Sequence, residues 1–155
     1  MTRATVPFAI PVKLPSALDR VYGYWNGLKR GESDIPFWDD LDLSSLSDLA
    51  DRLMLVDVFE MPQRFRFNSV GKVILESYGS DLAGKFSDEI DPKSPLEFFT
   101  SQASVTVEAN APTFFTATSE SRRDASNARL LLPMWGNGRI EMILGGVTKA
   151  TAIRS

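Results

Sequence analysis

The sequence predicts an α+β fold with one five-stranded antiparallel sheet, helices on one face of it and a further helix at the N-terminus. Strand-like segments gather in two places, residues 53–68 and 113–148, with helix-like segments before and between them. Gly136-Asn137-Gly138 separates the last two strand candidates, and Asn-Gly is the strongest short signal of a tight β-hairpin. The 155 residues, 43% of them hydrophobic, suit one compact domain with a packed core.

The first part of the chain is predicted to be an arm followed by two helices. Prolines interrupt residues 1–15, which we expect to be extended; residues 16–150 then form the domain and 151–155 a tail. Ser16 can cap a helix that Gly31 is placed to end. Its apolar positions recur at helical spacing: Leu18, Val21, Trp25 and Leu28. The second helix is short, with Leu46, Leu49 and Leu53 on one face.

Five segments are strand candidates. Residues 53–59 form the first, and 64–68 the second, in which Phe65 and Phe67 alternate with polar residues. This alternation is typical of a half-buried strand, and we expect it to pair with the first strand as a hairpin. The remaining candidates are residues 113–119, 128–135 and 140–148.

Two helices are predicted between the two groups of strands. The first spans residues 71–78 and is closed by Gly79. The second begins at Ser94, because Ser94 can cap it, Pro95 suits the first helical position and Glu97 completes a capping box.

Composition excludes several classes of function. The chain has no cysteine and no histidine, which rules out disulfides, thiolate catalysis, a Ser-His-Asp triad and a histidine-held haem. A net charge of -3 lacks the positive field that nucleic-acid binding needs. The acidic clusters at 39–42 and 88–91 lack the ligand order of a calcium loop, so we expect no metal site. No apolar run is long enough to span a membrane and no signal peptide is evident, so a cytoplasmic location is expected.

Several short motifs, in their order and spacing, resemble a family of bacterial single-domain PAS proteins. The resemblance covers roughly residues 16–148 and departs from the family at Asn68, where a basic residue is expected, and over 112–125. It implies a stand-alone sensory module, not an enzyme, that binds a small organic ligand, a partner signalling protein or both. The motifs are Tyr24-Trp25, Ile35-Pro36, Leu55-Val56-Asp57-Val58, Phe65-Arg66-Phe67-Asn68-Ser69-Val70-Gly71, Gly79-Ser80-Asp81-Leu82-Ala83-Gly84, Leu131-Leu132-Pro133 and Ile143-Leu144-Gly145.

Apolar and a few polar side chains are the candidates for a ligand pocket, since such pockets are mostly apolar with few polar groups. No cofactor is predicted: cysteine-linked flavin and histidine-held haem are excluded, and nothing points to flavin bound without a covalent link. We expect a cavity lined by Phe65, Phe114 and Met134 if the module senses a ligand. The full candidate set is Phe65, Phe67, Asn68, Tyr78, Phe86, Phe99, Phe114, Thr116, Leu132, Met134 and Met142.

The N-terminal helix offers a candidate interface. This helix and the following loop carry more aromatic residues than are needed to cover one sheet, which predicts that the helix packs in a homodimer. The equal alternative is that the helix packs only against the sheet of its own domain. The interface candidates are Tyr22, Trp25, Leu28 and Trp38. Two other functions stay open: a small cupped-sheet enzyme of the isomerase or dehydratase type using an Asp-Tyr pair, and an interaction domain with a filled core.

Overall fold

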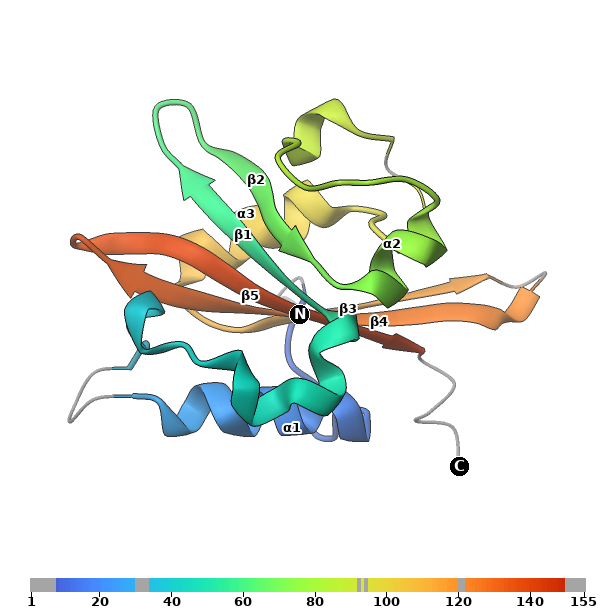
Figure 1. The fold of residues 1–155 in the computed structure, drawn as a ribbon, viewed down its shortest axis with the longest axis horizontal. Coiled ribbons are helices and arrows are strands. Elements are labelled where there is room, and N and C mark those ends of the chain that lie inside the picture. Colours follow the sequence, from blue (N-terminus) through green and yellow to red (C-terminus); the bar gives the residue numbers. More distant parts are fainter. Residues whose placement is uncertain (1–7, 30–33, 92, 94, 120–121, 150–155) are drawn as a thin grey trace, which may run out of the picture.

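The computed structural model describes residues 8–29, 34–91, 93, 95–119 and 122–149, and its centre is one antiparallel sheet (Figure 1). The strand order is β2-β1-β5-β4-β3. The predicted α+β class with a five-stranded antiparallel sheet is therefore confirmed. The strands are β1 (Leu53–Phe59), β2 (Arg64–Val70), β3 (Thr113–Ser119), β4 (Arg122–Gly136) and β5 (Arg139–Lys149).

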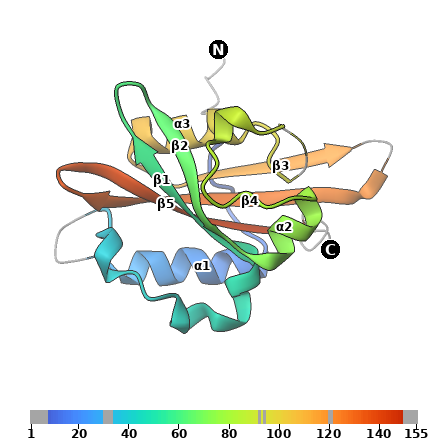
Figure 2. The same cartoon turned by 45° about the horizontal axis from the view of Figure 1, so that its top comes forward.

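Helices cover both faces of the sheet (Figure 2). We call the face under α2, η3 and α3 the inner face, and the face under α1 and η2 the outer face. The short helix predicted around Leu46 and Leu49 corresponds to η2, so it lies beside α1 on the outer face. The helical segments are α1 (Ser16–Gly27), η1 (Trp38–Asp40), η2 (Leu43–Arg52), α2 (Lys72–Tyr78), η3 (Ser87–Glu89) and α3 (Phe99–Ala109).

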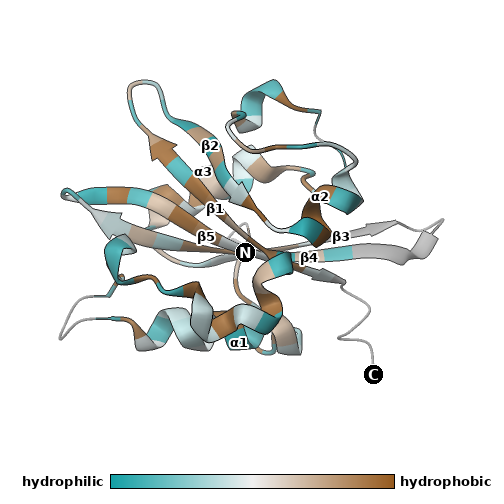
Figure 3. Cartoon of the chain, in the orientation of Figure 1, coloured by the Kyte–Doolittle hydropathy of each residue, from teal (hydrophilic) through white to brown (hydrophobic). Residues whose placement is uncertain are grey.

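Each face carries its own hydrophobic core, because successive residues of a strand point to opposite sides. Val56, Val58, Phe65 and Phe67 belong to the inner core, together with Phe99 of α3. The outer core lies under α1 and η2 and includes Leu18, Trp25, Leu49, Phe114, Leu132 and Met134. Apolar and polar residues alternate along the first half of β2, whereas β1 begins with a run of four apolar residues, Leu53–Val56, as a strand covered on both faces requires (Figure 3).

Both edges of the sheet are covered by other segments. The Phe67 amide of β2 donates to Lys85 O at 2.9 Å, and the Gly84 amide donates to Phe67 O at 2.7 Å. On β3, the Phe114 amide donates to Phe8 O of the N-terminal arm at 2.8 Å. These bonds satisfy backbone groups that an open strand edge would present to another chain.

Most predicted elements are present, with two corrections at helix starts. Pro15, not Ser16, is the N-cap of α1 and makes no side-chain capping bond. Helix α3 begins at Phe99, not near Pro95. Helix α1 also ends earlier than predicted, at Gly27 with Leu28 as its C-cap. The predicted end of that helix, Gly31, the predicted α3 cap, Ser94, and the tail lie outside the described residues. The Asn137-Gly138 turn is confirmed, with both residues at positive φ.

The late start of α3 has a tertiary cause. The Arg129 side chain of β4 donates to Pro95 O at 2.8 Å and to Glu97 O at 2.7 Å. Carbonyl oxygens held in this way by a buried guanidinium keep the segment out of the helix that its capping sequence favours. Phe98 then enters α3 through a left-handed backbone conformation, with φ 57°.

Within the described residues, no helix has the length and apolar character needed to cross a membrane.

Candidate functional site

The predicted ligand-binding residues do not form one pocket. Phe65, Phe67, Tyr78 and Phe99 lie in the inner core. Phe114, Leu132 and Met134 lie on the opposite face, beneath α1. The expected cavity lined jointly by Phe65, Phe114 and Met134 does not agree with the structure, because the sheet separates these side chains.

The other predicted ligand residues are scattered. Phe86 lies beside the β2 edge, with the Arg64 guanidinium 3.8 Å from its ring centroid. Thr116 is exposed on β3. Asn68 and Met142 line a hollow on the outer face.

A buried polar cluster lies between α3 and the sheet, and none of its four residues was among the predicted ligand-binding candidates. Gln102 and Thr106 of α3 face Thr113 of β3 and Arg129 of β4, and all four are buried. Gln102 accepts from Arg129 Nε at 2.7 Å and donates to Thr113 Oγ1 at 3.0 Å. The Thr106 and Thr113 hydroxyls are 2.6 Å apart. Each member therefore has a hydrogen-bond partner, as buried polar groups require.

Arg129 is the centre of this cluster. Burial lowers its pKa to about 10, and the charge of Glu97 acts in the opposite direction. The guanidinium is therefore cationic at neutral pH. Its carbon lies 4.8 Å from the ring centroid of Phe115 and 5.4 Å from that of Phe99. In the sequence, Arg129 stands out as the one charged residue among the apolar residues 128–134, and this is the signal that could have identified it.

A hollow of about 420 Å³ opens between η3 and the start of α3. We call it the α3 cleft; Ser87, Ile90 and residues 96–101 line it. Its lining is mostly apolar, and the exposed ring of Phe98 lies on its rim. Glu97 contributes a buried carboxylate oxygen, Oε1, that has no hydrogen-bond partner among the described groups. A buried polar atom without a partner is costly, so this oxygen distinguishes the cleft from ordinary packing.

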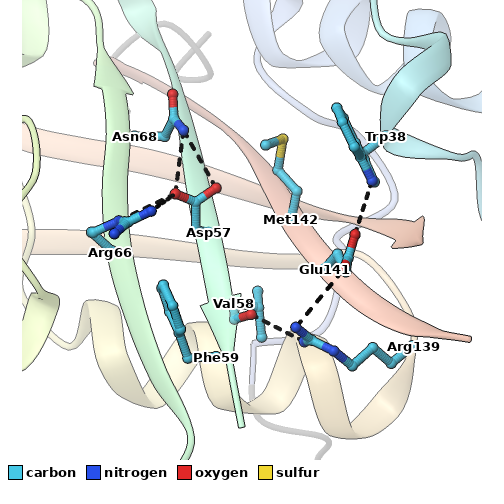
Figure 4. A pocket seen from close by; sticks show the side chains of 9 residues that line it. All are labelled: Trp38, Asp57, Val58, Phe59, Arg66, Asn68, Arg139, Glu141 and Met142. Carbon is cyan, nitrogen blue, oxygen red and sulfur yellow. Dashed lines mark hydrogen bonds and ion pairs between the residues drawn. The ribbon is translucent and has the colours of Figure 1, made fainter. Parts of the chain in front are cut away.

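A second hollow, of about 340 Å³, lies on the outer face, along the middle of β1 and β2 and the start of β5 (Figure 4). We call it the outer groove. Nine side chains line it: Trp38, Asp57, Val58, Phe59, Arg66, Asn68, Arg139, Glu141 and Met142.

The charges of the outer groove are paired with one another. Arg66 Nη2 lies 2.9 Å from Asp57 Oδ2, and Asn68 also donates to this carboxylate. On the other side, Trp38 Nε1 donates to Glu141 Oε1 at 3.0 Å, and Arg139 lies 3.9 Å from Glu141 (Figure 4). These groups form a self-satisfied polar surface.

The lip of the outer groove depends on Gly136 of β4. A Cβ at this position would lie 2.5 Å from Trp38 Cδ1 and 2.5 Å from Glu141 Oε1. Only glycine therefore lets the Trp38 indole lie against the strand while bonding Glu141.

The four predicted interface residues differ in their availability. Trp25 is buried against its own sheet, where its Nε1 donates to Pro133 O at 2.8 Å. Tyr22 stacks on Trp25, and Leu28 packs against the outer core. Trp38 is 42% exposed. The helix thus covers its own domain, and a homodimer through it stays a prediction.

No protein-family model matches the chain, and no curated protein matches it. A solved structure described as an RNA-binding Light-Oxygen-Voltage receptor is similar at 17% sequence identity, with a TM-score of 0.44. The match covers 81% of this chain and 37% of that one, so the chain spans little more than a third of that protein.

Proposed function

We propose that the chain is a PAS-type sensory module that binds a small organic ligand in the α3 cleft. The observation that carries the proposal is the position of Arg129. Its side chain stands on β4 and holds the main chain of the cleft wall at Pro95 and Glu97. A ligand that moves this wall must also change the contact with the sheet.

This linkage gives the ligand a physical route to the rest of the domain. Gln102 joins Arg129 to α3 and to Thr113 of β3, so cleft wall, helix and two strands share one hydrogen-bond network. Sensing then consists of a shift between two arrangements of this network, of which the ligand binds one more tightly. The output goes to a partner protein that remains to be identified, or to a second copy of the chain.

The enzyme alternative receives less support. It needs a carboxylate and a tyrosine in one hollow. Tyr78 Oη instead donates to Asp91 O at 2.8 Å, and Tyr24 Oη bonds the backbone of Asp42. The Asp57 carboxylate of the outer groove is engaged by Arg66 and Asn68.

Native and denaturing mass spectrometry of the full chain test the proposal. We expect an added mass that leaves on denaturation, and its loss in Ser101→Trp, which fills the cleft from an exposed position. The matched control is Asn68→Ala in the outer groove, which should keep the added mass. A bare chain, also after incubation with a mixture of small aromatic and aliphatic compounds, would contradict ligand binding in the cleft.

A further inference from the structure

The two edge strands of the sheet are covered to different extents. Beside β2, Gly84 and Lys85 make two main-chain hydrogen bonds with Phe67. Beside β3, the N-terminal arm makes one main-chain hydrogen bond within the described part of the chain, from the Phe114 amide to Phe8 O. The cover of β3 is therefore the weaker of the two.

The arm is held against the domain at few points. The ring centroids of Phe8 and Phe115 are 6.0 Å apart, and Ile10 packs against the outer core. Val12 is fully exposed, and the chain becomes buried again at Leu14. Two apolar side chains thus anchor the stretch of the arm that passes the β3 edge.

Strand β3 has no feature of its own that opposes pairing with another strand. Its seven residues, Thr113–Ser119, include no charged residue and no proline, and most are β-branched or aromatic. Such a composition favours pairing, whereas a charge or a proline on an edge strand opposes it. The other edge strand, β2, carries Arg64 and Arg66. Protection of the β3 edge therefore depends on the arm.

The directions of the β3 amides define how another strand would pair. The Phe114 amide points away from β4, because it donates to the arm, and amides alternate in direction along a strand. The Thr116 amide therefore points outward too, and in the described residues no segment outside the sheet bonds it. In an antiparallel pair of two β3 strands centred on Phe115, Phe114 lies opposite Thr116 of the second copy. Each such pair exchanges two hydrogen bonds.

We propose that the β3 edge is a docking site for a second copy of the chain, by antiparallel strand addition, and that the N-terminal arm is its displaceable cover. The arm and the second copy compete, because both need the Phe114 amide. A second copy fits because an uncharged strand meets no like charge when it pairs with itself, and a two-fold axis repeats the same bonds on both sides. Strands β3 and β4 extend beyond the helices, which leaves this edge accessible (Figures 1 and 2). The interface is separate from α1 and does not depend on ligand binding in the α3 cleft.

Variants of the full chain with a loosened arm test the proposal by analytical ultracentrifugation. Phe8→Ala combined with Ile10→Ser removes both anchors, so the dissociation constant of the dimer should fall by about tenfold, as the loss of an aromatic contact from the competing arm implies. Adding Thr116→Lys at an exposed position of β3 should restore the monomer, whereas Thr116→Val should not. The matched control is Ser69→Lys at an exposed position of β2, which should leave the dimer unchanged.

Hydrogen exchange of two amides distinguishes this dimer from one formed through α1. In the dilute unmodified chain, the Phe114 amide is bonded to the arm and should exchange more slowly than the Thr116 amide. In the loosened variant, the protection of both amides should rise with protein concentration. Circular dichroism and the melting temperature establish that each variant is folded.

Two results would overturn the proposal. A dimer that persists in Thr116→Lys, or that leaves exchange of the Thr116 amide independent of concentration, has its interface elsewhere. A loosened variant that stays monomeric at millimolar concentration shows either that the arm is not displaceable, if the Phe114 amide is still protected, or that the freed edge does not bind a second copy.

Discussion

The two hollows lie on opposite faces of the same sheet and differ in how their charges are satisfied. In the outer groove, Arg66 pairs with Asp57 and Arg139 with Glu60 and Glu141. In the α3 cleft, Glu97 Oε1 has no partner, and Arg129 is held by carbonyl and amide oxygens without an ion pair among the described residues. The outer groove is electrostatically complete on its own, whereas a buried carboxylate oxygen of Glu97, a residue of the cleft lining, lacks a hydrogen-bond partner among the described residues.

This contrast shows that charge density alone is a poor guide to a binding site. The outer groove carries more charged side chains, yet they are partly exposed and neutralise one another, which makes each pair weak. The cleft has fewer charges, but burial makes each of them expensive unless it is satisfied.

Trp25 and Trp38 both donate a hydrogen bond from the indole, but their contributions to the free energy of unfolding should differ most. Trp25→Ala removes a side chain that is 2% exposed and joins α1 to the outer core, so it should lower the free energy of unfolding by about 3–5 kcal/mol. Trp38→Ala, at the half-open groove, should cost about 1 kcal/mol. Urea unfolding measures both values. Equal losses would contradict the assignment of α1 as structural cover of the outer face.

Arg129 and Arg66 allow the same comparison of stability for a buried and a partly exposed charged side chain. Arg129→Ala should lower the free energy of unfolding by about 2–4 kcal/mol, because two buried acceptors and one partly buried acceptor lose their donor. Arg129→Lys should recover only part of this, since a lysine lacks the planar fork. Arg66→Ala removes an ion pair whose arginine is 41% exposed and should cost about 1 kcal/mol or less. If Arg129→Ala were as mild as Arg66→Ala, the buried network would not hold α3 to the sheet.

Gly136→Ala tests the lip of the outer groove. The added Cβ must displace Trp38 or Glu141, so we expect a loss of about 1–2 kcal/mol. Intrinsic tryptophan fluorescence should shift to longer wavelength as the indole becomes more exposed. Gly23→Ala is the control: its Cβ meets nothing within 4 Å in the middle of α1, and it should stabilise the chain by about 0.5–1 kcal/mol. An unchanged fluorescence spectrum for Gly136→Ala would show that Trp38 does not need this glycine.

The smallest effect concerns an exposed ion pair at the β2 edge. Hydrogen bonding from Arg64 holds the pKa of Asp88 below its usual value. Because the folded-state pKa is lowered, the stabilisation from this pair is present above the unfolded-state pKa and is lost as pH falls through the folded-state pKa. An NMR titration of Asp88 should show the low pKa, and Arg64→Gln should raise it towards the ordinary value. An Asp88 pKa that Arg64→Gln leaves unchanged would assign the shift to another cause.

Local patterns were sufficient for most of the fold. The alternation around Phe65 and Phe67 predicted β2 and its hairpin with β1, and Asn137-Gly138 predicted the last turn. These elements follow from side-chain period and turn chemistry, which act over a few residues. The predicted start of α3 was wrong because a donor 34 residues away, Arg129, binds Pro95 O.

The candidate site was much less predictable. Phe65 and Phe114 are both buried, as predicted, but they lie on opposite faces of the sheet, and only the strand register and the placement of the helices show this. Glu97 was interpreted as a capping residue, although its side chain lines the cleft.

By itself, the sequence determined the order of the strands and helices, the absence of cysteine and histidine chemistry, and the apolar residues available for a core. Only the tertiary structure decided which face each residue occupies, where α3 begins and which charges remain unpaired. The physical reason is range: propensity and periodicity act between neighbours in the chain, whereas burial and hydrogen bonding of Arg129 and Glu97 depend on segments that meet only in the folded protein.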